Sequence, residues 1–241
     1  MTEVVVGCAD FMCPAVQGLG SAYQRVNPYI VISVVQRAST LAYPMLVNGD
    51  LDIAILAWLP DKRAPSLWLQ PMVYDGLAII VHPQNGVPGL TIDQLQKLYQ
   101  GQVENWQDWG GLPGLPQLIS RETAASEYQY LQTRVMREIR TTLNASLAPD
   151  TEFMRKLVQE NPLAVGYLSS AWLSPGVRAV AIEGIPPGTE TIRNQIYPLT
   201  RRIDVVSLQE PAGAARTFIE WLLTTEGQEL LRNYGFVSIL E

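Results

Sequence analysis

The sequence predicts an α/β protein, and three observations support this class. Short apolar runs rich in β-branched residues alternate with amphipathic stretches along the whole chain. Residues 4–58 follow the order strand, helix, strand, helix, strand, which implies a parallel sheet with right-handed crossovers. Hydrophobic residues make up 47% and charged residues 17% of the 241 residues, a globular composition in a chain long enough to bury a core.

The first predicted strand, Val4–Val6, turns at Gly7–Met12 into a helix. Pro14 suits the first position of that helix, because its fixed backbone angle matches a helix and its missing N–H needs no partner there. Asn27–Pro28 ends the helix. Apolar residues at helical spacing predict one buried stripe, formed by Val16, Leu19, Tyr23 and Val26.

Tyr29–Val35 is predicted as a second strand because it is rich in β-branched residues. Ser39 is expected to cap the next helix, and Pro44 inside that helix should kink or shorten it. Leu51–Trp58 is a nearly continuous apolar strand interrupted only by Asp52, as expected for a strand covered on both faces.

The rest of the chain continues the alternation. The predicted strands are Met72–His82, Gln117–Arg121, Ala164–Leu168, Val177–Ile182 and Tyr197–Val206. The predicted helices are one capped by Thr91 and closed by Gly101, and those at Ala124–Thr142, Thr151–Gln159, Ala212–Leu223 and Glu226–Asn233. Thr225 and Gln228 match the spacing of a capping box for the last helix.

Composition also argues against several function classes. The net charge is −6 and no basic run is present, which argues against a nucleic-acid surface. No apolar run approaches the ~18–20 residues of a membrane span. His82 is the only histidine and no ligand spacing surrounds it, so neither a metal nor a cofactor is expected. Because Val4 already begins a strand, we read no leader peptide in this sequence.

Two cysteines, Cys8 and Cys13, flank the first predicted turn. A disulfide between them would close a short loop, which is compatible with a location outside the cytoplasm. The alternative is a pair of small buried thiols at a strand-to-helix turn, and the sequence favours this interpretation.

Several segments in register resemble the substrate-binding proteins of phosphate ABC transporters. The strongest is YDGLAIIVHPQNGVPGLTIDQLQKLYQGQVENWQDWGG, Tyr74–Gly111, in which the matching positions are Thr91, Gln94, Leu95, Gly101, Asn105, Trp106, Gly110 and Gly111. The others, in the family's order, are Ser120–Glu122, Val165–Ser169, Tyr197–Arg201 and Phe218–Ile239. Each is weak alone, but together they span essentially the whole chain.

This resemblance implies a two-lobed, type II periplasmic-binding-protein-like fold. Lobe 1 would be residues 1–75 plus 198–241, and lobe 2 residues 76–197, with Tyr74–Leu77 and Tyr197–Thr200 as hinge strands. A small ligand would bind between the lobes and stabilise their closure. The resemblance further implies an extracytoplasmic monomer that serves an ABC permease and performs no catalysis.

The expected site lies where strand ends meet helix N-termini, whose N–H groups suit an oxyanion. Three turns should converge there: Ala9–Cys13, Arg37–Thr40 and Arg121–Glu127. With the resemblance, the expected ligand-binding residues are Asp10, Phe11, Arg37, Ser39, Thr40, Asp52, Arg121, Ala125, Ser126 and Glu127. The family's Ser-Gly-Thr turn is Ala125-Ser126-Glu127 here. The added carboxylate leaves three outcomes open: phosphate, another small polar ligand, or a degenerate pocket that no longer binds, which an ion pair between Glu127 and Arg121 would favour.

Two other functions compete with transport. An enzyme would have to use Cys8, Cys13 or His82. The histidine, however, has no catalytic partner at a recognisable spacing, and it lies where a predicted strand gives way to a turn. A ligand-sensing domain of a signalling receptor or regulator uses the same fold, and fold alone does not fix function.

Overall fold

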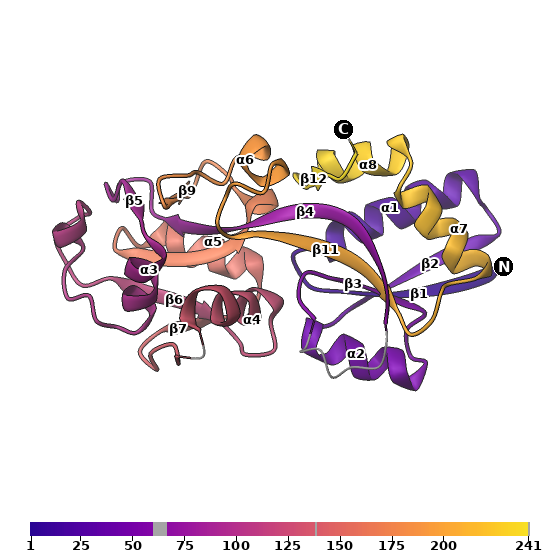
Figure 1. The fold of residues 1–241 in the computed structure, drawn as a ribbon, viewed down its shortest axis with the longest axis horizontal. Coiled ribbons are helices and arrows are strands. Elements are labelled where there is room, and N and C mark those ends of the chain that lie inside the picture. The colour runs from indigo at the N-terminus through magenta and orange to yellow at the C-terminus, as the bar shows by residue number, and fades with distance from the viewer. Residues whose placement is uncertain (60–66, 138, 241) are drawn as a thin grey trace. The chain divides into compact units, whose positions relative to one another are not determined.

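The computed structural model describes residues 1–59, 67–137 and 139–240. These residues form two compact units, and most of their helices and strands are labelled in Figure 1. The first unit comprises Met1–Tyr74, Ala124–Ser126 and Arg202–Glu241, and the second comprises Asp75–Thr123 and Glu127–Arg201. The predicted two-lobed α/β architecture is confirmed.

The first unit is built on a parallel sheet. Strands β1 (Thr2–Cys8), β2 (Ile30–Gln36) and β3 (Ile53–Leu56) pair in parallel, with β1 in the middle. The register sets Cys8 against Gln36, so the carboxyl ends of β1 and β2 lie at one edge of the sheet. This is the edge at which open α/β sheets bind ligands.

Strands from the rest of the chain extend this unit. Strand β11 (Thr200–Ser207) runs antiparallel to β3, and the short β12 (Val237–Ser238) runs antiparallel to β4 (Trp68–Val81). The chain changes unit within both long strands, between Tyr74 and Asp75 in β4 and between Arg201 and Arg202 in β11. It also enters the first unit briefly at 124–126.

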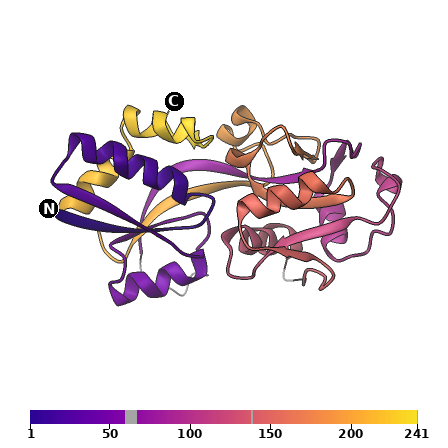
Figure 2. The same cartoon turned by 180° about the vertical axis from the view of Figure 1, so that it is seen from behind.

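Helices cover both faces of the first sheet. Helices α1 (Cys13–Val26), α7 (Gly213–Leu222) and α8 (Thr225–Asn233) lie on one face, and α2 (Ser39–Asn48) lies on the other (Figures 1 and 2). The predicted stripe of α1 is buried except for its last member, Val26, whose side chain is 55% exposed at the end of the helix.

Two predicted caps were misplaced. The N-cap of α2 is Ala38, and Ser39 is the first helical residue. The N-cap of α8 is Thr224, which accepts a hydrogen bond from the Gly227 N–H. Gln228 does not cap this helix, because its amide is buried and donates to backbone carbonyls of the unit.

The second unit contains the other end of β4. Strand β8 (Ala164–Ser169) pairs antiparallel with β4 and parallel with β6 (Gln117–Arg121), and β6 pairs parallel with β7 (Ser146–Ala148). The short strands are β5 (Gly89–Leu90), β9 (Arg178–Ala179) and β10 (Ala181–Ile182). The α-helices are α3 (Ile92–Tyr99), α4 (Ser126–Leu131), α5 (Thr151–Glu160) and α6 (Thr189–Arg193), and 3-10 turns are present at Trp106–Trp109 and Ser170–Trp172.

The predicted helix Ala124–Thr142 is wrong in length. Helix α4 continues as a π-helical turn, Gln132–Met136, and Arg137 then adopts a left-handed conformation with a φ of 50° that ends it. Residue 138, within the predicted helix, lies outside the described residues. The predicted strand Val177–Ile182 is divided into β9 and β10.

The predicted cap of α3 is confirmed. Thr91 accepts a hydrogen bond from the Gln94 N–H, and the Gln94 side chain accepts one from the Thr91 N–H. Among the described residues, no helix combines the length and the hydropathy needed to cross a lipid bilayer.

Candidate ligand-binding site

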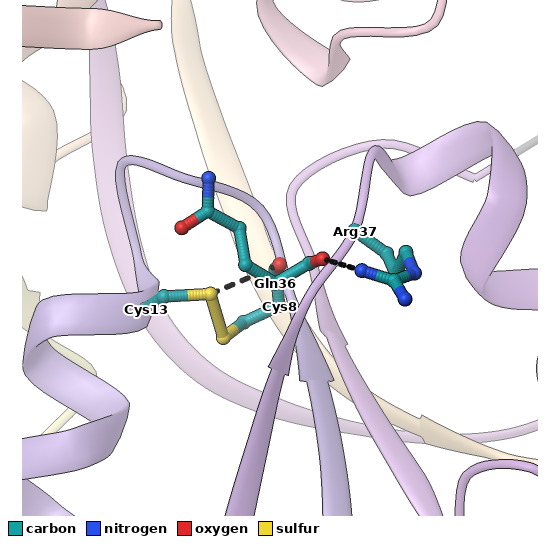
Figure 3. The surroundings of a disulfide bond; sticks show 4 residues. All are labelled: Cys8, Cys13, Gln36 and Arg37. Atoms are coloured by element: carbon teal, nitrogen blue, oxygen red, sulfur yellow. Dashed lines mark hydrogen bonds between the residues drawn. A yellow bond between two sulfur atoms is a disulfide. The ribbon is translucent and has the colours of Figure 1, made fainter.

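The first predicted turn joins β1 to α1 and is closed by a disulfide (Figure 3). Cys8 and Cys13 are bonded to each other, so the interpretation as two free thiols is corrected. Their Cα atoms lie 5.4 Å apart, because the strand ends and the helix begins within one tight turn. The bridge therefore encloses Asp10 and Phe11, the two residues predicted to face a ligand; Asp10 is half-buried and Phe11 is buried.

The second turn lies directly beside the first. The Arg37 backbone N–H donates to the Cys8 carbonyl at 2.9 Å, which continues the β1–β2 ladder into both turns. The exposed Arg37 side chain turns back, and its Nη1 donates to the Gln36 carbonyl at 2.7 Å (Figure 3). Its guanidinium is therefore held at the rim of this sheet edge.

Ser39 carries a buried hydroxyl in the second turn. It is fully buried in the first turn of α2, and its Oγ has no hydrogen-bond partner among the described residues. Its neighbour Thr40 donates from Oγ1 to the Ala124 carbonyl at 3.3 Å. This bond brings the second turn next to the third, of which Ala125 and Ser126 are also buried.

The structure corrects the placement of Asp52. This residue precedes β3 rather than lying inside it, and it is exposed at the amino end of the strand. Its Oδ2 accepts a hydrogen bond from the Val5 N–H at 2.7 Å, so the carboxylate is bonded to the backbone of β1. The carboxyl end of β1 pairs with Ile55, three residues and about 10 Å farther along the strand. Asp52 therefore does not join the turns of the site.

Arg121 ends β6 in the second unit and is almost completely buried. Its Nη1 donates to Thr151 Oγ1 at 3.3 Å and its Nη2 donates to the Pro149 carbonyl at 3.2 Å. Glu127 lies in the first turn of α4, with its Oε1 3.7 Å from Arg121 Nη1. The side chains of the pair are 4% and 0% exposed, so this is a buried ion pair in low dielectric.

Tyr167 supports Arg121 from β8. Burial raises the pKa of the Tyr167 hydroxyl well above its ordinary value, so the hydroxyl stays protonated. It shares a 2.9 Å hydrogen bond with Ser120 and accepts one from the Arg121 N–H at 2.9 Å. These bonds fix the backbone at the end of β6.

Sequence reasoning missed the residues that hold Arg121, namely Pro149, Thr151 and Tyr167. Strand β7, which the sequence did not predict, leads directly into the turn at Pro149. A sequence signal for Thr151 does exist, because it directly follows Asp150, a residue type that often caps helices. Asp150 caps α5 by accepting a hydrogen bond from the Phe153 N–H at 2.7 Å, so Thr151 is the first residue of that helix.

Within each unit, most of the predicted residues gather at a strand-to-helix edge. The first unit brings together the turns that carry Asp10, Phe11, Arg37, Ser39, Thr40, Ala125 and Ser126, and the second holds Arg121 and Glu127 in contact. In the part of the chain that the structure describes, no cluster of three or more metal-ligating side chains is present.

Comparison with known proteins gives consistent matches over the full length. The family model described as PBP superfamily domain matches residues 1–226. The phosphate-binding protein PstS of Bacillus subtilis is 22% identical over 249 residues, covering 99% of this chain and 81% of the relative. The PstS protein of Borreliella burgdorferi is 21% identical, covering 98% of this chain and 90% of the relative.

Solved structures agree with the fold. A substrate-binding protein assigned to a phosphate ABC transporter of Clostridium perfringens, solved with bound phosphate, has a TM-score of 0.92 and 25% identity over 98% of this chain and 99% of its own. An ABC-type phosphate transport receptor of Vibrio cholerae has a TM-score of 0.85 and 26% identity, covering 98% of this chain and 99% of its own. The protein described here belongs to the PBP superfamily.

Proposed function

We propose that this protein is the extracytoplasmic solute-binding protein of a phosphate-type ABC transporter. It captures a small oxyanion, phosphate or a similar species, between lobe 1 (residues 1–75 plus 198–241) and lobe 2 (residues 76–197). It acts as a monomer, delivers the ligand to a permease and performs no chemistry on it.

The observation that carries this proposal is the buried hydroxyl of Ser39. A buried polar group without a partner costs about 1–3 kcal/mol, so such groups in native proteins need an explanation. This hydroxyl lies in the first turn of α2, the end at which a helix leaves N–H groups without intrahelical partners and its dipole is positive. An oxyanion would accept hydrogen bonds from both, which removes the cost.

Three further observations support the proposal. The first turn is preorganised by the Cys8–Cys13 disulfide, and disulfides persist in oxidising compartments outside the cytoplasm. Arg121 ends a parallel strand, the position from which a guanidinium can grip an oxyanion. The two relatives named above are phosphate-binding proteins, and the two structural neighbours are a phosphate ABC transporter substrate-binding protein and an ABC-type phosphate transport receptor.

The test is a calorimetric titration of the full-length protein with inorganic phosphate. We expect Ser39→Ala to weaken phosphate binding by about tenfold to a hundredfold, because a hydrogen bond to a charged group contributes about 1.5–3 kcal/mol. Ser21→Ala, an exposed serine of α1, is the matched control and should bind like the wild type. Equal affinity of the two variants, or no phosphate binding by the wild-type protein, would contradict the proposal.

A further inference from the structure

A hollow of about 470 Å³ in the second unit is not explained by the binding of an inorganic oxyanion. It lies between the end of β6, the first turns of α4 and the segment that leads into β7. Ligand pockets for organic molecules have volumes of about 300–1,000 Å³, whereas a tetrahedral inorganic anion fills only a small part of such a space.

The lining of this hollow is rich in hydroxyl groups. Thr123, Tyr128, Thr141 and Thr142 all line it. In the described part of the chain, the hydroxyls of Thr123 and Tyr128 make no hydrogen bond, so both can bond a ligand. Thr141 Oγ1 accepts from the Gln132 side chain at 2.7 Å and keeps its own proton to donate.

One wall of the hollow is apolar and exposed. Leu143 and Leu147 line it, and these residues are 101% and 60% exposed. Exposed leucines beside a hydroxyl-lined surface suit a carbon skeleton that carries hydroxyl groups, because the skeleton can cover the leucines while its hydroxyls reach the threonines and the tyrosine.

The hollow is held in shape by bonds to its surroundings. The Thr142 N–H donates to the Tyr99 carbonyl at 2.8 Å, and the backbone pairing of Ser120 with Leu147 fixes the segment against β6. Preorganised walls cost a ligand less ordering entropy than mobile loops do.

Arg121 also lines the hollow, and it is the strand-end arginine of the proposed oxyanion site. We propose that the ligand is a hydroxylated phosphate monoester whose phosphate is held at the oxyanion site and whose organic part occupies this hollow. This inference rests on the proposed function, because it uses the same oxyanion site. A plain inorganic anion would leave the hydroxyls of Thr123 and Tyr128 unused.

The experiment compares glycerol 3-phosphate, inorganic phosphate and glycerol as calorimetric titrants of the full-length protein. We expect the ester to bind at least tenfold more tightly than inorganic phosphate, and glycerol alone to bind weakly. Tyr128→Phe should weaken ester binding by about five- to tenfold, the effect of one hydrogen bond, and leave phosphate binding unchanged. Tyr29→Phe, an exposed tyrosine of the first unit, is the matched control.

The outcomes separate the two proposals. If phosphate binds but the ester binds no more tightly, or if Tyr128→Phe leaves ester binding unchanged, the inference about the organic part is overturned and the oxyanion function stands. If neither phosphate nor the ester binds, the proposed function fails, and this inference fails with it.

Discussion

Asp75 and Arg201 form a buried ion pair that joins the two long strands β4 and β11. Arg201 Nη2 lies 2.7 Å from Asp75 Oδ2, and Nε donates to the same oxygen at 2.9 Å. The other carboxylate oxygen of Asp75 accepts from the hydroxyls of Ser169 and Ser170. Both partners belong to the second unit, which β4 enters at Asp75 and β11 leaves after Arg201. The pair therefore ties both crossover strands to the end of β8.

Asp75→Asn should destabilise the protein by about 3–5 kcal/mol, because it removes one of the two charges of a buried ion pair. Urea denaturation followed by circular dichroism measures this loss. Glu220→Gln, which removes a charge from the exposed Arg216–Glu220 pair, is the control and should cost less than about 1 kcal/mol. A loss of similar size in both variants would contradict the assigned role of Asp75.

The Cys8–Cys13 disulfide closes a short loop, and we expect its removal to lower both stability and affinity. The double variant Cys8→Ser, Cys13→Ser should lose about 2 kcal/mol of unfolding free energy, the loop-closure entropy of a ring of this size. Phosphate affinity should fall as well, because Asp10 and Phe11 lie inside the loop. Denaturation and calorimetry of this variant, beside the wild type under oxidising conditions, test both effects. Unchanged phosphate affinity would show that the turn is ordered without the bridge.

The sequence predicts the fold better than the site. The order of β1, α1, β2, α2 and β3 follows from apolar periodicity, which reports burial directly. Strand β7 escaped prediction because its three residues, Ser146–Ala148, are too few to show a period. Asp52 was assigned to the site because it interrupts the predicted apolar strand Leu51–Trp58 and because the resemblance implies an aspartate on that strand. The strand begins only at Ile53, and this small shift of a boundary decides which edge of the sheet the side chain occupies.

The sequence left the pairing of Arg121 with Glu127 open as one alternative, and the structure shows the two side chains in contact. Both residues were assigned to the third turn, but their contact depends on how the chain folds back between β6 and α4. Thr151 and the Pro149 carbonyl, which hold the same guanidinium, come from a segment beyond α4. Such long-range partners are set by packing rather than by local pattern.

Glu127→Gln should strengthen oxyanion binding. The carboxylate lies beside Arg121 in a buried position, where it repels a second anion and offsets part of the positive charge of the arginine. We expect at least a tenfold gain in phosphate affinity, since like charges about 4 Å apart interact by several kcal/mol at a protein surface. Calorimetry measures the gain, at a temperature where circular dichroism shows the variant folded.

Glu160→Gln, an exposed residue of α5, is the control for a general change in net charge. A gain of equal size in this control would assign the effect to the overall charge of the protein. A loss of phosphate affinity in Glu127→Gln would instead mean that Glu127 orients Arg121 for the ligand.

Asp204 on β11 should make the protein less stable as the pH rises through its titration range. A salt-bridged acid with a lowered pKa has the opposite effect. Burial raises the pKa of Asp204 from the ordinary value of 3.8, and the nearby Arg202 only partly offsets this. Between the ordinary and the raised pKa, the folded state binds more protons than the unfolded state, so the contribution of Asp204 falls as the pH rises through that window. At neutral pH the buried carboxylate therefore costs stability, and acidification relieves that cost.

Asp204→Asn removes this dependence. The variant should therefore exceed the wild type in unfolding free energy by more at pH 7 than at pH 4. Denaturation curves at both pH values give the difference, and Asp50→Asn, at an exposed position of the same unit, provides the reference. A difference that is the same at both pH values, or one that favours the variant more at pH 4, would show that Arg202 rather than burial controls this carboxylate.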